Sequence, residues 1–145
     1  MSSFFGEYRH KVDAKGRLSL PSAFRKLVTV DTQLVVAPDV TKKSLWVFSE
    51  QAYENWVDTL FEKRGGYNPG NSDHVGLRRM LNAQARSIAM DAAGRINISA
   101  DQRETTHIDK DVVLVGNADH FEIWDVALWE QEFSAIDLES LLFNS

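Results

Sequence analysis

The chain opens on two short β-type runs separated by turn residues. Residues 8–12 and 17–20 flank the segment Asp13-Ala14-Lys15-Gly16. Aspartate at the first position of such a segment and glycine at the fourth favour a type I turn followed by a left-handed residue. We therefore predict a β-hairpin here. A short helical turn should follow over 21–27, since proline tolerates the first helical position.

Two strands and a helix come next. Residues 33–37 and 45–49 are rich in Val, Leu, Trp and Phe, which favour strands. Residues 50–61 carry apolar side chains at helical spacing, and Ser49 is placed to cap that helix. The apolar stripe consists of Tyr53, Trp56, Val57, Leu60 and Phe61.

The second half shows the same order of elements. Strands are predicted near 87–91, 95–98, 112–116 and 121–125, and a helix over 126–139. Ser99 and Gln102 could form a capping box for the short helical turn of this half. Between the halves, residues 62–71 contain glycine, asparagine and proline and predict a loop, after which Ser72 should cap a helix over 73–85.

This order reflects an internal repeat. Residues 13–20 align with residues 91–98 at an offset of 78, with Asp, Ala, Gly and Arg identical. The match extends through strand-like and helix-like segments, so we predict two copies of one unit, 8–61 and 86–139, joined by a linker over 62–85. One such unit is too small to be stable alone. We expect the two to share a core about a pseudo-twofold axis, giving a mainly β domain with short helices and two β-β-α-β-β-α repeats.

Composition excludes several classes of protein. The chain has 145 residues, 43% of them hydrophobic and 26% charged, which is typical of a globular domain and not of a disordered chain. Its apolar runs are far shorter than the roughly 20 residues of a membrane span, and no signal peptide is visible at the N-terminus. There is no cysteine, which excludes disulfides and thiolate metal sites and agrees with a reducing cytoplasm.

Charge is distributed unevenly. The net charge is −5, yet residues 1–26 contain six Lys or Arg against two Asp or Glu. Residues 87–145 contain three Lys or Arg against twelve Asp or Glu. A basic front end on an acidic protein indicates a polyanionic partner for one surface, although a solvated charged strand would give the same pattern.

Motifs for catalysis and metal binding are missing from the sequence. The four histidines, His10, His74, His107 and His120, do not lie at metal-ligand spacing. The sequence contains no H-E-x-x-H run, nucleophile elbow or phosphate-binding loop. We therefore predict no catalytic residue, metal, cofactor or small-molecule substrate, and a protein that is not an enzyme.

The Asp-x-x-Gly-Arg turn, present twice, is the most specific feature. In a structural interpretation Asp13 and Gly16, like Asp91 and Gly94, shape the turns, and each aspartate pairs with the arginine that follows. In a functional interpretation the turn holds Lys15 and Arg17 towards phosphates or base edges. The two interpretations are compatible.

The two copies differ in charge. Ala93 replaces Lys15, and Ser87 and Ala89 replace Arg9 and Lys11. The predicted nucleic-acid face is therefore the first hairpin, with Arg9, Lys11, Lys15 and Arg17 as its cations.

These motifs resemble the bacterial MraZ family. In the first half of the chain the resemblance rests on Phe5-Gly6-Glu7-Tyr8, on the run from Asp13 to Pro21, and on Phe24-Arg25. In the second half it rests on Val113-Leu114-Val115-Gly116, on the run from Phe121 to Asp125, and on Trp129-Glu130. The resemblance covers about residues 4–139.

The resemblance implies a fold and a function. MraZ proteins are transcriptional regulators with a double-split β-barrel, related to the AbrB-like swapped-hairpin proteins. They form ring-shaped homo-oligomers on the bacterial nucleoid and bind tandem short repeats in double-stranded promoter DNA. The promoter is that of their own division and cell-wall gene cluster, which they usually repress. The DNA-contacting arginine corresponds to Arg17, with Lys15 beside it, and Arg95 matches the second signature.

Two other functions stay open at this point. AbrB-like relatives include antitoxins, so a protein-binding module of antitoxin type is the alternative. That function calls for a long polar tail, whereas about six residues follow the last predicted helix. RNA binding is a lesser alternative, since no aromatic stacking motif for RNA is present.

Overall fold

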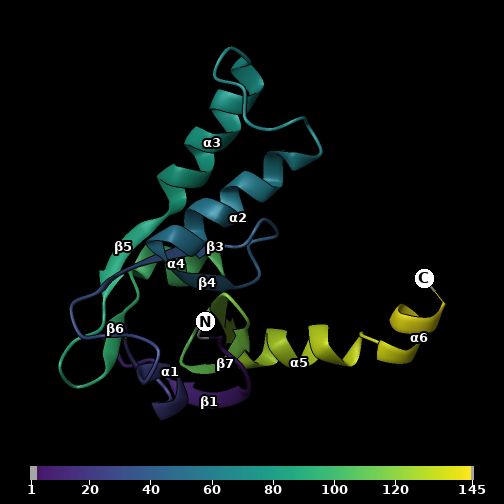
Figure 1. Ribbon diagram of the computed structural model, residues 1–145. Coiled ribbons are helices and arrows are strands. Elements are labelled where there is room, and N and C mark those ends of the chain that lie inside the picture. Colours follow the sequence, from purple (N-terminus) through teal and green to yellow (C-terminus); the bar gives the residue numbers. More distant parts are fainter. Residues whose placement is uncertain (1–2, 145) are drawn as a thin grey trace.

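The computed structural model describes residues 3–144 (Figure 1). The first half contains β1 (Glu7–Lys11), β2 (Arg17–Ser19), α1 (Ser22–Arg25), β3 (Gln33–Pro38), β4 (Leu45–Ser49) and α2 (Glu50–Glu62). The helix α3 (Ser72–Gln84) follows. The second half contains β5 (Arg86–Ala89), β6 (Arg95–Asn97), α4 (Ala100–Thr105), β7 (Asp111–Asn117), β8 (His120–Asp125), α5 (Val126–Ser134) and α6 (Leu138–Phe143).

The strands form two antiparallel sheets. Six of them assemble in the order β1-β7-β8-β4-β3-β5, and β2 pairs with β6 in a separate two-stranded ribbon. Within residues 3–144 these strands do not close into a barrel. The eight strands and the short helices confirm the prediction of a mainly β fold with short helices for the described residues.

Strand pairing joins the two halves symmetrically. On the ribbon, Leu18 of β2 lies opposite Ile96 of β6, its counterpart at the offset of 78. In the large sheet the pair His10–Val112 has its counterpart in the pair Ile88–Leu34, again at an offset of 78. The central pairing of β4 with β8 is likewise reciprocal, so each half completes the sheet of the other.

The predicted local hairpin is wrong. β1 pairs over five residues with β7, and β2 pairs with β6. Among the described residues, backbone pairing between the two runs is limited to an isolated bridge from Val12 to Leu18 and a hydrogen bond from Asp13 N–H to the Arg17 carbonyl. Long-range pairing prevails because it gives β1 a full-length partner and puts Leu18 into the core at 0% exposure.

The main core lies between the ribbon and one face of the large sheet. The ribbon side supplies Leu18, Leu20, Ile96 and Ile98, each no more than 1% exposed. The sheet side supplies Leu34, Val36, Leu45, Val47, Val112, Leu114, Phe121 and Ile123. Burying each such side chain stabilises the fold by about 1.5–3 kcal/mol, so the short ribbon is held mainly by what it buries.

The helix α2 covers part of the opposite face of the sheet. Its buried residues Tyr53, Val57 and Phe61 pack with Phe48 in a second core. Ser49 caps α2 by accepting the Ala52 N–H, as predicted. The helix α3 packs beside α2, and the two project from the sheet as a helical hairpin (Figure 1).

Two capping predictions need correction. The helix α3 begins at Ser72, and its cap is Asn71, whose side chain accepts the N–H groups of Asp73 and His74. Ser99 caps α4 through the Gln102 N–H, but the capping box is incomplete. The Gln102 amide instead donates to the carbonyls of Val36 and Gln84, which tie α4 to β3 and α3.

The predicted single helix over 126–139 is also wrong. The helix α5 ends at Ser134, and Asp137 begins α6 by accepting the Ser140 N–H. Aspartate interrupts helices in this way because its side chain competes for nearby backbone donors. The outer part of α5 and all of α6 extend away from the sheets as an arm (Figure 1).

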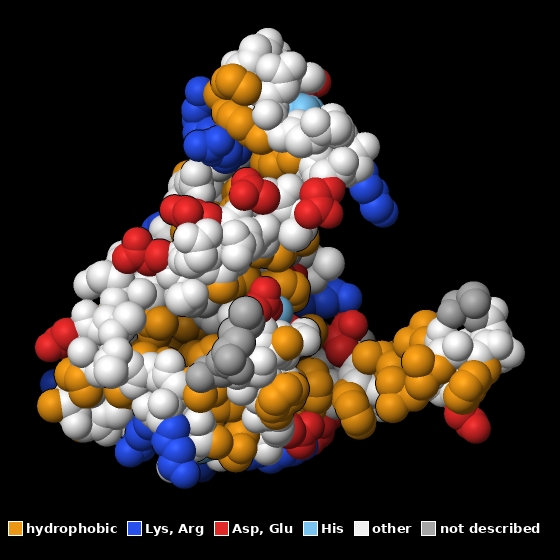
Figure 2. Space-filling view, viewed as in Figure 1, with side chains coloured by type: hydrophobic (Ala, Val, Ile, Leu, Met, Phe, Trp, Pro, Cys, Tyr) orange, Lys and Arg blue, Asp and Glu red, His pale blue; other side chains and the backbone are white. Residues whose placement is uncertain are grey.

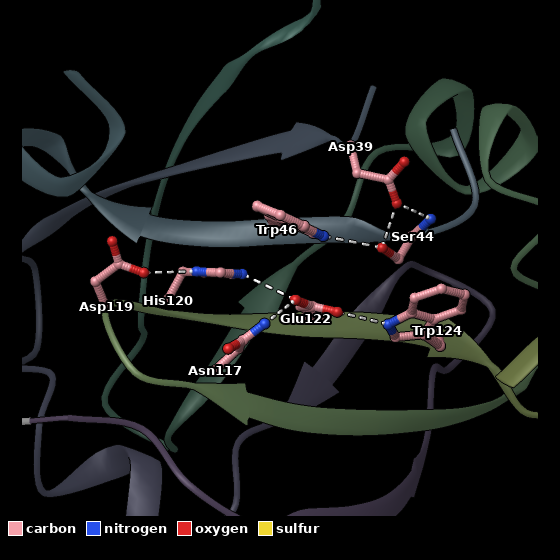
Figure 3. Close-up of polar contacts among 8 residues, drawn as sticks. All are labelled: Asp39, Ser44, Trp46, Asn117, Asp119, His120, Glu122 and Trp124. Atoms are coloured by element: carbon pink, nitrogen blue, oxygen red, sulfur yellow. Dashed lines mark hydrogen bonds and ion pairs between the residues drawn. The ribbon is translucent and has the colours of Figure 1, made fainter. Parts of the chain in front are cut away.

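A buried polar network lies where β4 meets β8 (Figure 3). His120 is 5% exposed and stacks on Trp46, with ring centroids 4.1 Å apart. Its Nδ1 lies 2.8 Å from an Asp119 oxygen and its Nε2 lies 2.9 Å from a Glu122 oxygen. A neutral imidazole has one N–H donor, so two carboxylate partners favour the imidazolium form.

The same contacts shift both titrations. Burial alone lowers the pKa of His120, but the hydrogen bonds to Glu122 and Asp119 outweigh it and raise that pKa above 6.5. Burial alone raises the pKa of Glu122. The hydrogen bonds that it accepts from His120, Asn117 and Trp124 outweigh this and lower that pKa below 4.5. Each charged group therefore stabilises the other in the folded state.

The network predicts a stability that falls at alkaline pH. A raised folded pKa at His120 stabilises the protein fully below about 6.5, and this contribution is lost as the pH rises through the folded pKa. Urea unfolding at pH 6 and pH 8.5 should show a loss of about 1.4 kcal/mol for each unit that separates the two pKa values. His120→Gln should abolish this loss and Glu122→Gln should reduce it. If the free energy of unfolding changed with pH in the same way in the wild type and in His120→Gln, the assignment of the loss to His120 would be contradicted.

Candidate nucleic-acid interface

The first signature turn is organised by one carboxylate. Asp13 Oδ1 accepts the backbone N–H groups of Lys15 and Arg17, each at 2.9 Å. Asp13 Oδ2 accepts Nε–H of Arg17 at 2.8 Å. The Gly16 N–H closes the turn onto the Asp13 carbonyl. One side chain thus fixes both the turn backbone and the direction of the arginine.

The second signature turn has the same geometry. Asp91 Oδ1 accepts the N–H groups of Ala93 and Arg95, and Asp91 Oδ2 accepts Nε–H of Arg95 at 3.1 Å. The backbone hydrogen bond from Arg95 is the largest influence on the pKa of Asp91, as that from Arg17 is for Asp13. Both pKa values are lowered below 3.8, so both carboxylates stay ionised above moderately acidic pH.

Each turn is held against the other half of the chain. The Gly16 carbonyl accepts the Ile98 N–H, and the Gly94 carbonyl accepts the Leu20 N–H. Both glycines have a positive φ, 85° at Gly16 and 78° at Gly94. A Cβ on Gly16 would lie 2.3 Å from the Ile98 carbonyl oxygen. Both positions favour glycine because the conformation is left-handed, and Gly16 also needs it because another backbone approaches closely.

The ribbon brings Arg17 and Arg95 to one surface. Leu18 and Ile96 point into the core, so the residues on either side of each must point outwards. Arg17 lies opposite Asn97, and Arg95 lies opposite Ser19. The outer face of the ribbon therefore carries both signature arginines, while Lys15 is exposed at the first turn.

Two arginines that the sequence analysis did not select lie next to the turns. Arg25 approaches Gly94, since a Cβ there would meet its Nε at 2.5 Å, and this Nε donates to the Leu20 carbonyl. The Arg103 guanidinium lies beside Gly16. Within residues 3–144, Nε of Arg103 is buried and has no hydrogen-bond partner. The sequence repeat could have indicated both residues, because Arg25 and Arg103 are the same residue type at equivalent positions of the two copies.

Arg9 and Lys11 do not join this surface. On β1 the side chains of Tyr8 and His10 point inwards, and His10 Nδ1 lies 2.7 Å from the Ser19 carbonyl of β2. The alternating residues Arg9 and Lys11 must therefore leave from the opposite face of the sheet. There Arg9 pairs with Glu130 of α5 at 2.9 Å, and Lys11 pairs with Asp111 at 3.5 Å.

Two other features are absent from residues 3–144. No group of three or more His, Cys, Asp or Glu side chains is placed to hold a metal ion in this part of the chain. Over the same residues, no helix has the length and apolar character needed to cross a bilayer.

Comparison with known proteins identifies the class. The Transcriptional regulator MraZ of Mycolicibacterium smegmatis is 33% identical over 145 residues, covering 95% of this chain and 96% of the relative. The protein of the same name from Lachnoclostridium phytofermentans is 35% identical over 127 residues, covering 88% and 84%. That from Mycoplasmoides gallisepticum is 31% identical over 128 residues, covering 88% and 85%. These relatives are transcriptional regulators.

A family model gives the same result. The model described as "MraZ protein, putative antitoxin-like" matches residues 3–64 and 81–142. The chain therefore belongs to the MraZ family of transcriptional regulators, as the sequence motifs predicted.

Glycine substitution separates close approach from backbone strain. Gly16→Ala and Gly65→Ala both force alanine into a positive φ, 85° and 80°, which costs about 1–2 kcal/mol. A Cβ at Gly65 meets nothing within 4 Å, whereas at Gly16 it meets the Ile98 carbonyl. Gly16→Ala should therefore lower the free energy of unfolding by about 1–3 kcal/mol more than Gly65→Ala, the usual cost of over-packing.

Urea titrations of the two variants would measure the difference. Equal destabilisation by Gly16→Ala and Gly65→Ala would show that the approach of the two halves at the turns is not restrictive.

Proposed function

We propose that this protein binds double-stranded DNA through the outer face of the β2–β6 ribbon and thereby represses transcription. One observation carries the proposal: Arg17 and Arg95 project from the same face of an antiparallel ribbon, each oriented by its own aspartate. A two-stranded ribbon fits the major groove, where sequence can be read from base edges.

The Asp–Arg pairs suit base recognition. Each aspartate engages Nε, and among the described residues the terminal nitrogens of Arg17 and Arg95 have no hydrogen-bond partner. The two terminal NH2 groups of a guanidinium can each donate one N–H, to O6 and N7 of guanine, as a fork. A side chain held in place in advance loses less conformational entropy on binding. Lys15, Arg25 and Arg103 supply charge for phosphates around the two arginines.

The proposal includes the organisation of the chain. Residues 8–61 and 86–139 are two swapped-hairpin repeats joined by residues 62–85, and the ribbon and large sheet together correspond to a double-split β-barrel. The reciprocal strand registers support this division. Because the two turns lie at opposite ends of one ribbon, each repeat contributes one arginine to a single DNA-binding face.

The proposed target and assembly follow from family membership. The DNA would be tandem short repeats in the promoter of the protein's own division and cell-wall gene cluster, on the nucleoid in the cytoplasm, and the protein would act as a ring-shaped homo-oligomer. One ribbon offers few contacts, so single subunits would bind weakly. Linked subunits raise the effective concentration, and avidity can add about 100–10,000-fold.

Substitution of Arg17 tests the DNA face. Arg17→Ala should weaken binding to the DNA upstream of the protein's own gene by about 1–3 kcal/mol per site, the value of a good base contact. Arg95→Ala should have a comparable effect. The measurement is a fluorescence anisotropy titration at several salt concentrations, with scrambled DNA of equal length. A lost phosphate contact lowers the salt slope by about 0.9, whereas a lost base contact lowers the preference for the promoter.

Arg9→Ala is the matched control. Arg9 is also a surface arginine paired with a carboxylate, but it leaves the sheet on the face opposite the ribbon. We expect its affinity and its preference for promoter DNA to stay close to wild type. Equal, weak binding of both DNAs by the wild type and Arg17→Ala would refute the proposal and direct attention to an antitoxin-type protein partner.

A further inference from the structure

The arm, residues 133–143, presents an apolar surface to solvent. Phe133, Ile136, Leu138, Leu142 and Phe143 are each at least 50% exposed. Neither α5 nor α6 contains a buried residue among those the structure describes. Leu138 and Leu142 lie four residues apart and so share one face of α6. Exposed apolar side chains gathered on one projecting element mark a contact surface, and Figure 2 shows them along the arm.

The arm is also acidic. Residues 133–143 contain Asp137 and Glu139 and no Lys or Arg. No salt bridge among the described residues involves either carboxylate, in contrast to Glu130 and Glu132 nearer the sheet, which pair with Arg9 and Lys43. A surface that fits the arm should therefore combine apolar groups with positive charge.

Such a surface exists on the α2–α3 hairpin. Arg78 and Arg79 lie on α3, and among the described residues neither of them forms a salt bridge, although Arg78 lies over the Tyr67 ring. Met80, next to Arg79 on α3, is 58% exposed. Lys and Arg side chains gather over α3 in Figure 2. We call the three consecutive residues Arg78, Arg79 and Met80 of α3 the hairpin patch.

The arm and the hairpin patch of one chain point in different directions. In Figure 1 the α2–α3 hairpin rises from one side of the sheet, while α5 and α6 extend sideways from another. We propose that the arm of one subunit docks on the hairpin patch of a second copy of this chain. Opposite charge and exposed apolar side chains on both surfaces make a second copy the partner that fits.

A contact between two different surfaces sets the type of assembly. The contact between the arm and the hairpin patch is heterologous. Every subunit in a series of such contacts therefore offers one arm and one patch to its neighbours. Such contacts close into a ring when the rotation per subunit allows, and otherwise form filaments. The inference rests on the ring assembly in the proposed function and assigns its contact surfaces. The β2–β6 ribbon is part of neither, so it stays free for DNA.

Two variants, each defective in one surface, test the contact. Leu138→Asp with Leu142→Asp removes the apolar face of the arm. Arg79→Glu with Met80→Asp reverses charge and polarity on the hairpin patch. All four side chains are exposed, so the fold should persist, which circular dichroism and thermal unfolding would verify. In light scattering after gel filtration, the wild type should be an oligomer and each variant a monomer of 16.4 kDa.

Mixing the two variants gives the decisive result. The arm variant retains an intact hairpin patch, and the patch variant retains an intact arm. An equimolar mixture can therefore form one contact per pair, which should give dimers with twice the monomer mass and nothing larger. A mixture that stays monomeric, or an arm variant that stays oligomeric, would overturn the inference. Val40→Asp, at a 68% exposed valine on neither surface, is the control and should assemble like the wild type.

DNA binding by the same proteins separates this inference from the proposed function. With the ribbon intact, both variants should bind a single promoter repeat like the wild type and lose the additional affinity for tandem repeats, about 100-fold or more. If the mixture forms dimers but the wild type does not distinguish promoter from scrambled DNA, the contact stands and the DNA-binding function fails. If DNA is recognised but the arm variant remains oligomeric, the function stands and the contact fails.

Discussion

The structure depends on pairing between strands that are distant in sequence. The ribbon consists of three-residue strands, one from each half, and would not persist without the core beneath it. Leu18 and Ile96 at its centre are fully buried, and the carbonyls of Gly16 and Gly94 receive backbone hydrogen bonds from the opposite half. The edge strands β1 and β5 likewise pair with strands of the other half. Neither half can satisfy its backbone groups or bury its apolar face alone.

The same turns serve stability and the proposed recognition of DNA. Asp13 and Asp91 hold the turn backbone, which positions glycine for the close approach of the other half. With the second carboxylate oxygen each aspartate orients an arginine on the ribbon surface. A requirement of the fold therefore also fixes the side chains that carry the proposed function, so no separate scaffold is needed for the proposed DNA-binding face.

The two halves differ where their surroundings differ. The helix α2 buries three side chains and is covered by α3, whereas α5 packs on β7 and β8 and continues into the arm. At the β4–β8 pairing, Trp46 of the first half lies opposite Glu122 of the second. Among the described residues, only the second half places a histidine between carboxylates (Figure 3). These differences give one chain two unlike ends, which a head-to-tail assembly requires.

The sequence by itself determined the order of the elements up to the start of α5, the four-residue turns, the Ser49 cap and the family. These features depend on local chemistry, because turn residues, apolar periodicity and caps act over a few positions. The sequence also indicated Arg17 and Arg95 as equivalent residues, but it did not reveal that both lie on one ribbon face.

Tertiary structure alone decided which strands pair. Alternation predicts that residues 8–12 and 17–20 are strands, but it is silent on whether they pair with each other or with the other half. It likewise could not show that Arg9 leaves the opposite side of the sheet and pairs with Glu130, or that Arg103 approaches Gly16. The physical reason is that burial of the shared core decides which strands pair and which side chains point outwards, and this core exists only when both halves are in place.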